Sequence, residues 1–202
     1  YEFASTYSYL AAMRIEALAE AAGVDLRWRP FLLGPVSAAQ GSASSPFNLD
    51  PPRSRYLWRD MEREAARLGL PCIRPNPFPQ NGLAAARVAL LGSERGFAPA
   101  FTKAIYALEF GEGRSIADAA VVSDVLKRIG QDPAAILREA QAEPNKTRLK
   151  AVIEEARSRG VFGAPTFFAE DGEMFWGNDR LEQAVAWAAG DRPRLTEASP
   201  GA

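Results

Sequence analysis

The stretch that decides the fold reads Gly160-Val161-Phe162-Gly163-Ala164-Pro165-Thr166-Phe167-Phe168. A proline cannot donate to a sheet ladder, so Pro165 must begin a strand or lie at an edge. The apolar residues 166–168 then predict a short buried strand. A trans bond before Pro165, the commoner form in folded proteins, would simply open this strand. A cis bond would turn the N–H and carbonyl of Ala164 outward, where they can pair with an extended ligand.

The residues that follow extend this strand into a hairpin and a helix. Asp171-Gly172 is a two-residue turn signal, and residues 173–176 predict a second short strand. A last helix is predicted from Asn178 to Gly190, with apolar residues at helical spacing. Residues 191–202 predict a disordered tail.

The first thirty residues predict a strand, a turn, a helix and a second strand. Residues 1–3 form the end of the first strand, and residues 9–22 carry apolar side chains at helical spacing. Ser5 and Thr6 are good N-cap residues for this helix. Residues 24–29 alternate in polarity and predict the second strand. Because two short strands are not stable alone, the strands at both ends of the sequence must share one sheet.

The middle of the chain predicts a block of helices. Residues 32–52 predict a loop, residues 53–68 a strongly amphipathic helix, and residues 71–81, with four prolines, a non-helical segment. Further helices are predicted at 83–91, 95–110, 118–129, 133–142 and 146–159. The predicted fold is therefore α/β. A βαβ…ββα sheet unit comprises residues 1–50 and 155–190, and a helical domain, residues 51–154, is inserted between its two halves.

The composition excludes several classes of function. With 24 basic and 25 acidic residues, the net charge favours neither nucleic acid nor an anionic membrane as a binding partner. No apolar run is long enough to span a bilayer. The single cysteine, Cys72, cannot form an intramolecular disulfide, which favours a cytoplasmic location. The absence of histidine excludes Ser-His-Asp and Cys-His nucleophiles and histidine-bearing metal sites. An enzyme of this composition would take its reactive group from a cofactor or cosubstrate.

Two turns carry the candidate site residues. Ser5 lies where a helix begins, and the free N–H groups and dipole of a helix start favour an anion. An N-cap without further function is the commoner role for such a serine. The second turn comprises residues 176–180, where Asn178 or Asp179 could likewise cap a helix. Alternatively, a carboxylate there could receive the ammonium group of a ligand.

Together these residues resemble the 2-hydroxychromene-2-carboxylate isomerases and, beyond them, the kappa-class glutathione transferases. Both belong to the DsbA-like branch of the thioredoxin fold. The resemblance covers residues 1 to about 190 and is carried by YEFASTYSYLA (1–11), WRPFLLG (28–34), SPFN (45–48), RYLWRD (55–60), PFPQN (77–81), GVFGAPTFF (160–168) and FWGNDRL (175–181). The predicted order of elements is also the order of that family.

The resemblance implies a glutathione-dependent cis-trans isomerase. Its substrate would be 2-hydroxychromene-2-carboxylate, converted to trans-o-hydroxybenzylidenepyruvate, or a related aromatic-degradation intermediate. Ser5 would donate to the glutathione sulfur and favour the thiolate. The backbone of Ala164, before a cis Pro165, would pair with the cysteinyl unit. The thiolate would add to the conjugated double bond, rotation about the resulting single bond would follow, and elimination would return the thiol.

The resemblance also assigns the remaining subsites. The γ-glutamyl end of glutathione would be held by Trp176, Gly177, Asn178 and Asp179. Asn48 would reach the glycine end or the substrate, and Tyr7 and Arg53 would contact the substrate, a small aromatic carboxylate. A homodimer is also implied.

The sequence departs from the family pattern at two positions and leaves alternatives open. Many relatives have proline in place of Thr6 and lysine in the loop near Arg53, so the substrate contact of Arg53 is not guaranteed. The same site could serve a kappa-like transferase or peroxidase, or a DsbA-like binding protein without catalysis. A two-cysteine oxidoreductase is disfavoured, because Ser5 and Ser8 occupy the Cys-X-X-Cys positions.

Overall fold

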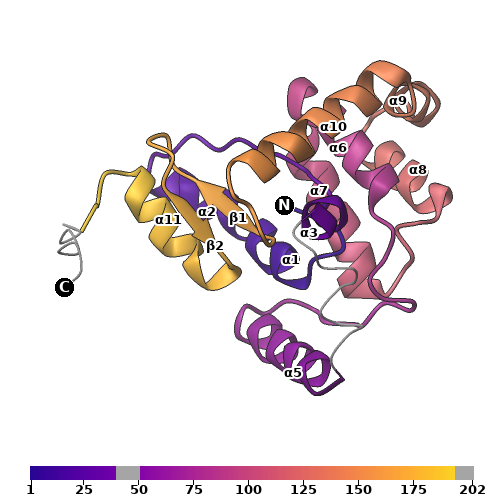
Figure 1. The fold of residues 1–202 in the computed structure, drawn as a ribbon. Helices are drawn as coiled ribbons and strands as arrows, with labels where there is room; N and C mark the ends of the chain where they lie inside the picture. Colours follow the sequence, from indigo (N-terminus) through magenta and orange to yellow (C-terminus); the bar gives the residue numbers. More distant parts are fainter. Residues whose placement is uncertain (40–50, 194–202) are drawn as a thin grey trace.

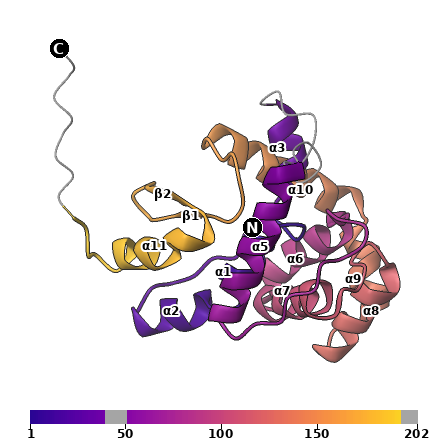
Figure 2. The same ribbon diagram turned by 90° about the horizontal axis from the view of Figure 1, so that it is seen from below.

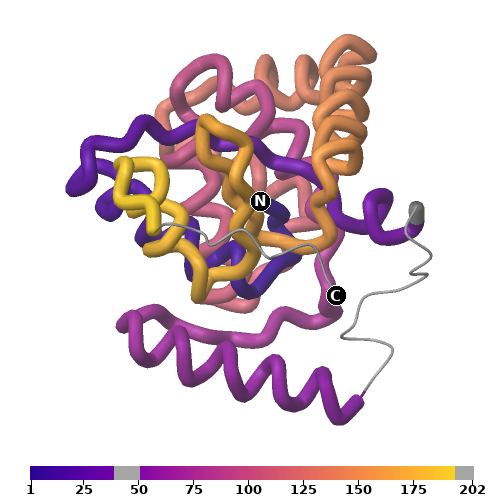
Figure 3. The backbone as a smooth tube through the Cα atoms, turned by 60° about the vertical axis from the view of Figure 1, so that its left-hand side comes forward, coloured from indigo at the N-terminus to yellow at the C-terminus, as the bar shows by residue number. Residues whose placement is uncertain are grey.

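The computed structural model describes residues 1–39 and 51–193 of the chain. A hairpin of two strands with helices α1, α2 and α11 forms one part of the molecule, and helices α6 to α10 form a larger body beside it (Figure 1). Figure 3 shows the carboxyl-terminal hairpin lying over the amino-terminal residues. In Figure 2, helix α5 runs across the underside of the molecule next to α1.

The predicted hairpin is confirmed. Strands β1 (Thr166–Phe168) and β2 (Met174–Trp176) pair antiparallel, with Phe167 opposite Phe175. The Asp171 side chain accepts from the N–H of Glu173 at 3.2 Å and closes the turn. The N–H of Gly177 donates to the carbonyl of Pro165 at 3.0 Å, which continues the pairing beyond both strands.

The two predicted amino-terminal strands are not formed. Among the described residues the sheet has two strands; residues 1–2 and 24–29 have no assigned secondary structure, and Phe3 already lies in the turn before α1. The N–H of Tyr1 donates to the carbonyl of Arg29 at 3.0 Å, and the N–H of Phe31 donates to the carbonyl of Tyr1 at 2.9 Å. These two bonds follow the pattern of a parallel ladder, so the predicted neighbours do lie side by side. No further bond of this ladder is found among the described residues.

The predicted helix over 9–22 is two helices in the structure, α1 (Thr6–Ala12) and α2 (Ile15–Ala21). The predicted start is confirmed, because Ser5 is the N-cap and its Oγ accepts from the N–H of Ser8 at 3.1 Å. The break falls at Arg14, whose side chain contacts Asn178 in the turn before the last helix and Glu182 in that helix.

The remaining helices follow the predicted pattern with shifted bounds. They are α3 (Leu33–Ala39), α5 (Pro51–Arg67), α6 (Leu83–Arg95), α7 (Ala98–Tyr106), the π-helical η1 (Ala107–Gly111), α8 (Ala119–Arg128), α9 (Pro133–Ala140), α10 (Glu143–Ser158), the 3-10 turn η2 (Asn178–Arg180) and α11 (Leu181–Ala188). Helix α3 replaces part of the loop predicted at 32–52. Helix α6 runs past its predicted end to Gly96, whose φ of +81° terminates it.

The main core joins the amino-terminal residues to the helical body. Phe3 and Tyr9 are fully buried and pack against Tyr106, and Tyr9 stacks on Phe110 at 5.3 Å between ring centroids. The Ser5 turn therefore rests directly on the helical body. Within residues 1–39 and 51–193, no helix combines the length and apolar character needed to cross a membrane.

Candidate active site

The structure brings the Ser5 turn and the proline corner together. The hydroxyl of Ser5 donates to the carbonyl of Ala164 at 2.9 Å, although the two residues are 159 positions apart in the chain. The bond between Ala164 and Pro165 is cis. Ser5 and Ala164 are both partly exposed, so a ligand can reach the point where they meet.

The Ser5 hydroxyl also has a second bond, since its Oγ accepts from the N–H of Ser8. A hydroxyl has one proton and two lone pairs, so Ser5 can keep the Ser8 bond and redirect its proton. If that proton turned to a ligand sulfur, the carbonyl of Ala164 would become free to accept from the ligand. The corner therefore offers one donor and one acceptor side by side.

An exposed aromatic pair borders this corner. Trp176 is 51% exposed and Phe162 is 48% exposed, and their rings meet edge to face at 4.8 Å between centroids. Gly163 lies directly beneath the indole, and a Cβ at this position would overlap the ring nitrogen of Trp176. Trp176 was a predicted site residue, but Phe162 was not. The sequence pattern that could have indicated it is an aromatic side chain in a short segment flanked by Gly160 and Gly163.

The turn after β2 presents a carboxylate. Gly177 has φ +105°, a conformation that other residues rarely adopt, and a Cβ there would come within 2.5 Å of Asp179 Oδ1. The Asp179 side chain thus folds back over Gly177 while it stays exposed, and it pairs with Arg180 at 3.4 Å. An ammonium group could approach this carboxylate from solvent.

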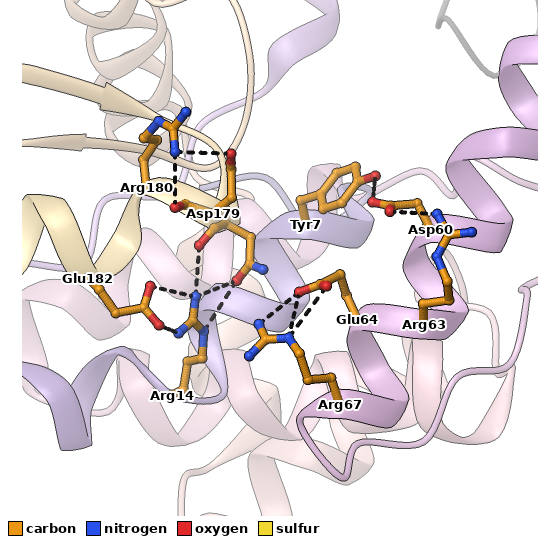
Figure 4. Close-up of polar contacts among 10 residues, drawn as sticks. Tyr7, Arg14, Asp60, Arg63, Glu64, Arg67, Asp179, Arg180 and Glu182 are labelled. Carbon is orange, nitrogen blue, oxygen red and sulfur yellow. Dashed lines mark hydrogen bonds and ion pairs between the residues drawn. The ribbon is translucent and has the colours of Figure 1, made fainter.

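Asn178, by contrast, faces the interior, with only 3% of its surface exposed. Its Oδ1 accepts from Arg14 Nε at 3.3 Å and from Arg14 Nη2 at 3.1 Å, and its carbonyl accepts from Nη2 at 2.7 Å (Figure 4). Arg14 also pairs with Glu182, and this bond lowers the pKa of that carboxyl. The Asn178 side chain therefore secures the turn from behind. Arg14 was missed by sequence reasoning, and its only signal was a charge within an apolar helical run.

Tyr7 points toward helix α5. Its hydroxyl donates to Asp60 Oδ2 at 2.7 Å, and Asp60 Oδ1 in turn accepts from Arg63 at 3.0 Å (Figure 4). Burial, followed by the bond to Asp60, raises the pKa of Tyr7 well above its usual range. Tyr7 is therefore a neutral phenol at physiological pH, held at the side of the Ser5 turn.

Two predicted site residues remain. Arg53 is exposed in the first turn of α5, and Asn48 lies outside the described residues. In the described part of the chain no cluster of three or more acidic, cysteine or histidine residues could hold a metal ion. Burial raises the pKa of the Cys72 thiol, which disfavours its reactive thiolate form.

Comparison with known proteins is consistent with this geometry. A family model described as DSBA-like thioredoxin domain matches residues 1–186. A 2-hydroxychromene-2-carboxylate isomerase of Sphingobium xenophagum is 29% identical over 182 residues, which are 90% of this chain and 92% of that protein. The enzyme of the same name from Pseudomonas putida is 30% identical over 182 residues, 90% of this chain and 88% of the relative.

Solved structures confirm the predicted fold class. The structure of a selenomethionyl 2-hydroxychromene-2-carboxylate isomerase is similar with a TM-score of 0.85 and 28% identity, and covers 95% of this chain and 92% of its own. A probable DsbA oxidoreductase from Streptomyces coelicolor is similar with a TM-score of 0.73 and 21% identity, and the match covers 100% of this chain and 93% of the oxidoreductase. The second likeness concerns the fold alone.

Proposed function

The chain belongs to the DSBA-like thioredoxin domain family and, within it, to the 2-hydroxychromene-2-carboxylate isomerases, and from this premise we propose that it is a glutathione-dependent isomerase. Its substrate is 2-hydroxychromene-2-carboxylate or a related small aromatic carboxylate. The observation that carries the proposal is the bond from Ser5 to the carbonyl of Ala164 at a cis proline.

In the proposed complex the glutathione sulfur lies next to Ser5. The hydroxyl leaves the Ala164 carbonyl and donates to the sulfur, while that carbonyl accepts from the cysteinyl N–H of glutathione. The start of α1 adds a favourable dipole for the thiolate. The exposed carboxylate of Asp179 receives the ammonium group of the γ-glutamyl end, and Trp176 forms an apolar wall beside the tripeptide.

The reaction then needs no acid or base of the histidine kind. The ring C–O bond of the hemiketal first opens, and the proton of the C2 hydroxyl passes to the phenolic oxygen, which gives the open-chain keto acid with its double bond cis. The thiolate then attacks the carbon β to the ketone, a carbon–sulfur bond forms, and the electron pair of the double bond moves onto the ketone as an enolate. The former double bond is now single and rotates. Expulsion of the thiolate restores the double bond in the other geometry and regenerates glutathione. Homodimer formation remains a prediction of the resemblance, and a cytoplasmic location remains a prediction from the single cysteine.

The test combines binding and turnover. Calorimetry with glutathione is compared with calorimetry with S-methylglutathione, and isomerisation of 2-hydroxychromene-2-carboxylate is followed by absorbance. We expect both tripeptides to bind but only glutathione to support turnover. Equal turnover without any tripeptide would refute the proposal, and conjugation of generic electrophiles without isomerisation would indicate a kappa-like transferase.

A further inference from the structure

A small cavity lies in the helical body, away from the Ser5 turn. It has a volume of about 150 Å³ and is formed by the start of α6, the segment before α8, and α9. Leu83, Ala84 and Leu137 contribute apolar walls. None of the residues that line it belongs to the group around Ser5 and Ala164, so the cavity is a separate feature of the fold.

Arg87 of α6 is the charged residue that lines the cavity. Its Nε is fully buried and has no hydrogen-bond partner, and no carboxylate in the described part of the chain forms an ion pair with its guanidinium. The backbone at this position is well held, because Asn145 Nδ2 donates to the Arg87 carbonyl at 3.0 Å. Arg95, on the same helix, pairs with Glu139 in the usual way.

The other polar side chains of the cavity are amides rather than acids. Asn81 uses its Oδ1 to accept from the N–H of Leu83 at 3.0 Å, so its NH₂ group remains as a donor. Gln141 supplies a second amide at the rim. Arg87 is partly exposed, but its Nε is buried without a partner, and the planar fork of the guanidinium matches a carboxylate with two parallel hydrogen bonds. The chemistry of the cavity is therefore that of an anion site.

The size of the cavity limits the anion. A cavity of about 150 Å³ is of the size that holds a molecule as small as benzene, which is too small for a tripeptide. We propose that this cavity binds a small organic carboxylate, with the carboxylate on the Arg87 guanidinium and a short apolar tail against Leu83 and Leu137. The site is independent of glutathione and of the isomerase reaction.

The test uses propionate as the probe and the full chain labelled with ¹⁵N. Sodium propionate is titrated while the Arg87 Nε–H resonance is followed, and sodium chloride at equal ionic strength serves as the control. We expect a saturable shift with a dissociation constant on the order of 1 mM for propionate and none for chloride. An equal shift with chloride, or saturation by sulfate but not by propionate, would overturn the proposal.

Two variants and one matched control make the test specific. Arg87→Met keeps the aliphatic stem and removes the charge, and Ala84→Leu keeps Arg87 but fills the cavity. We expect each variant to weaken propionate binding at least tenfold, as measured by calorimetry. Arg95→Met removes the same charge from the same helix outside the cavity and should bind as the unmodified protein does. Unchanged binding in the folded Ala84→Leu variant would contradict the proposed position.

Discussion

At the scale of single residues, Ser5 has two bonds of different kinds. The bond it accepts from Ser8 caps α1, and the bond it donates to Ala164 is available to a ligand. We expect Ser5→Ala to lower turnover about 10²- to 10³-fold, the usual loss when one donor to a developing or stabilised anion is removed. Glutathione affinity should fall much less, since the rest of the tripeptide contacts are kept.

The same substitution should raise the pKa of bound glutathione, measured by thiolate absorbance against pH. Ser158→Ala is a suitable control, because Ser158 bonds only to its own helix, at the carbonyl of Glu155. A Ser5→Ala enzyme with unchanged turnover and unchanged thiol pKa would show that Ser5 is only a helix cap.

Arg14 acts at the same scale but through another residue. Its three bonds to Asn178 hold the turn that presents Asp179. Arg14→Met should raise the dissociation constant for glutathione about tenfold and leave kcat at saturating glutathione nearly unchanged. Arg14→Lys, which lacks the fork needed to span both oxygens of Asn178, should be intermediate. A loss confined to kcat would contradict this positioning role.

At the scale of elements, the π-helical η1 buries an acid. Glu109 is 0% exposed, and neither carboxylate oxygen has a partner among the described residues. Burial, and then the nearby Glu2, raises the pKa of Glu109 well above 4.5, and burial raises that of Glu2 to about 7. Because the folded-state pKa values of these two carboxyls exceed the unfolded ones, their contribution to stability is greatest below about pH 4.5 and is lost as pH rises toward the folded values.

Glu109→Gln should remove part of the decrease in stability that accompanies rising pH. Urea unfolding at pH 5 and pH 8 should show a smaller decrease in the free energy of unfolding for the variant, and a more stable variant at pH 8. Glu154→Gln is the control, because Glu154 is exposed and its bond to Arg157 lowers its pKa, which gives the opposite and weaker dependence. Identical pH dependence in Glu109→Gln and the unmodified protein would contradict the prediction.

The elements also show which features a sequence can predict. The hairpin of β1 and β2 and the cap at Ser5 depend on neighbours in the chain, and both were predicted. The break at Arg14 depends on Asn178, 164 residues away, so helical periodicity could not reveal it. Likewise, the residues of the site could be predicted from the family resemblance, but the burial of Asn178 against Arg14 depends on tertiary packing.

At the scale of the whole molecule, the site lies where three parts of the chain meet. Ser5 and Tyr7 come from the amino-terminal turn, Ala164 from the carboxyl-terminal hairpin, and Asp60 from α5. The amino-terminal turn is anchored in the core through Phe3, and α5, which crosses the view in Figure 2, packs Trp58, Met61 and Ala65 into the same core. The bond from Tyr7 to Asp60 adds a polar link between α1 and α5 beside the site.

Tyr7→Phe removes this bond and leaves Asp60 with Arg63 as its partner. A hydrogen bond to a charged group contributes about 1.5–3 kcal/mol, and solvent at this half-buried position reduces that value. We therefore expect amide exchange in α5 to accelerate about tenfold in native-state hydrogen exchange, while exchange in the buried α7 is unchanged. Arg59→Met, which breaks the exposed pair of Arg59 with Glu62 on the same helix, is the control and should leave both helices as they are. If α5 and α7 accelerated equally in Tyr7→Phe, α5 would open only with the whole molecule, and the bond would stabilise the global fold rather than one wall of the site.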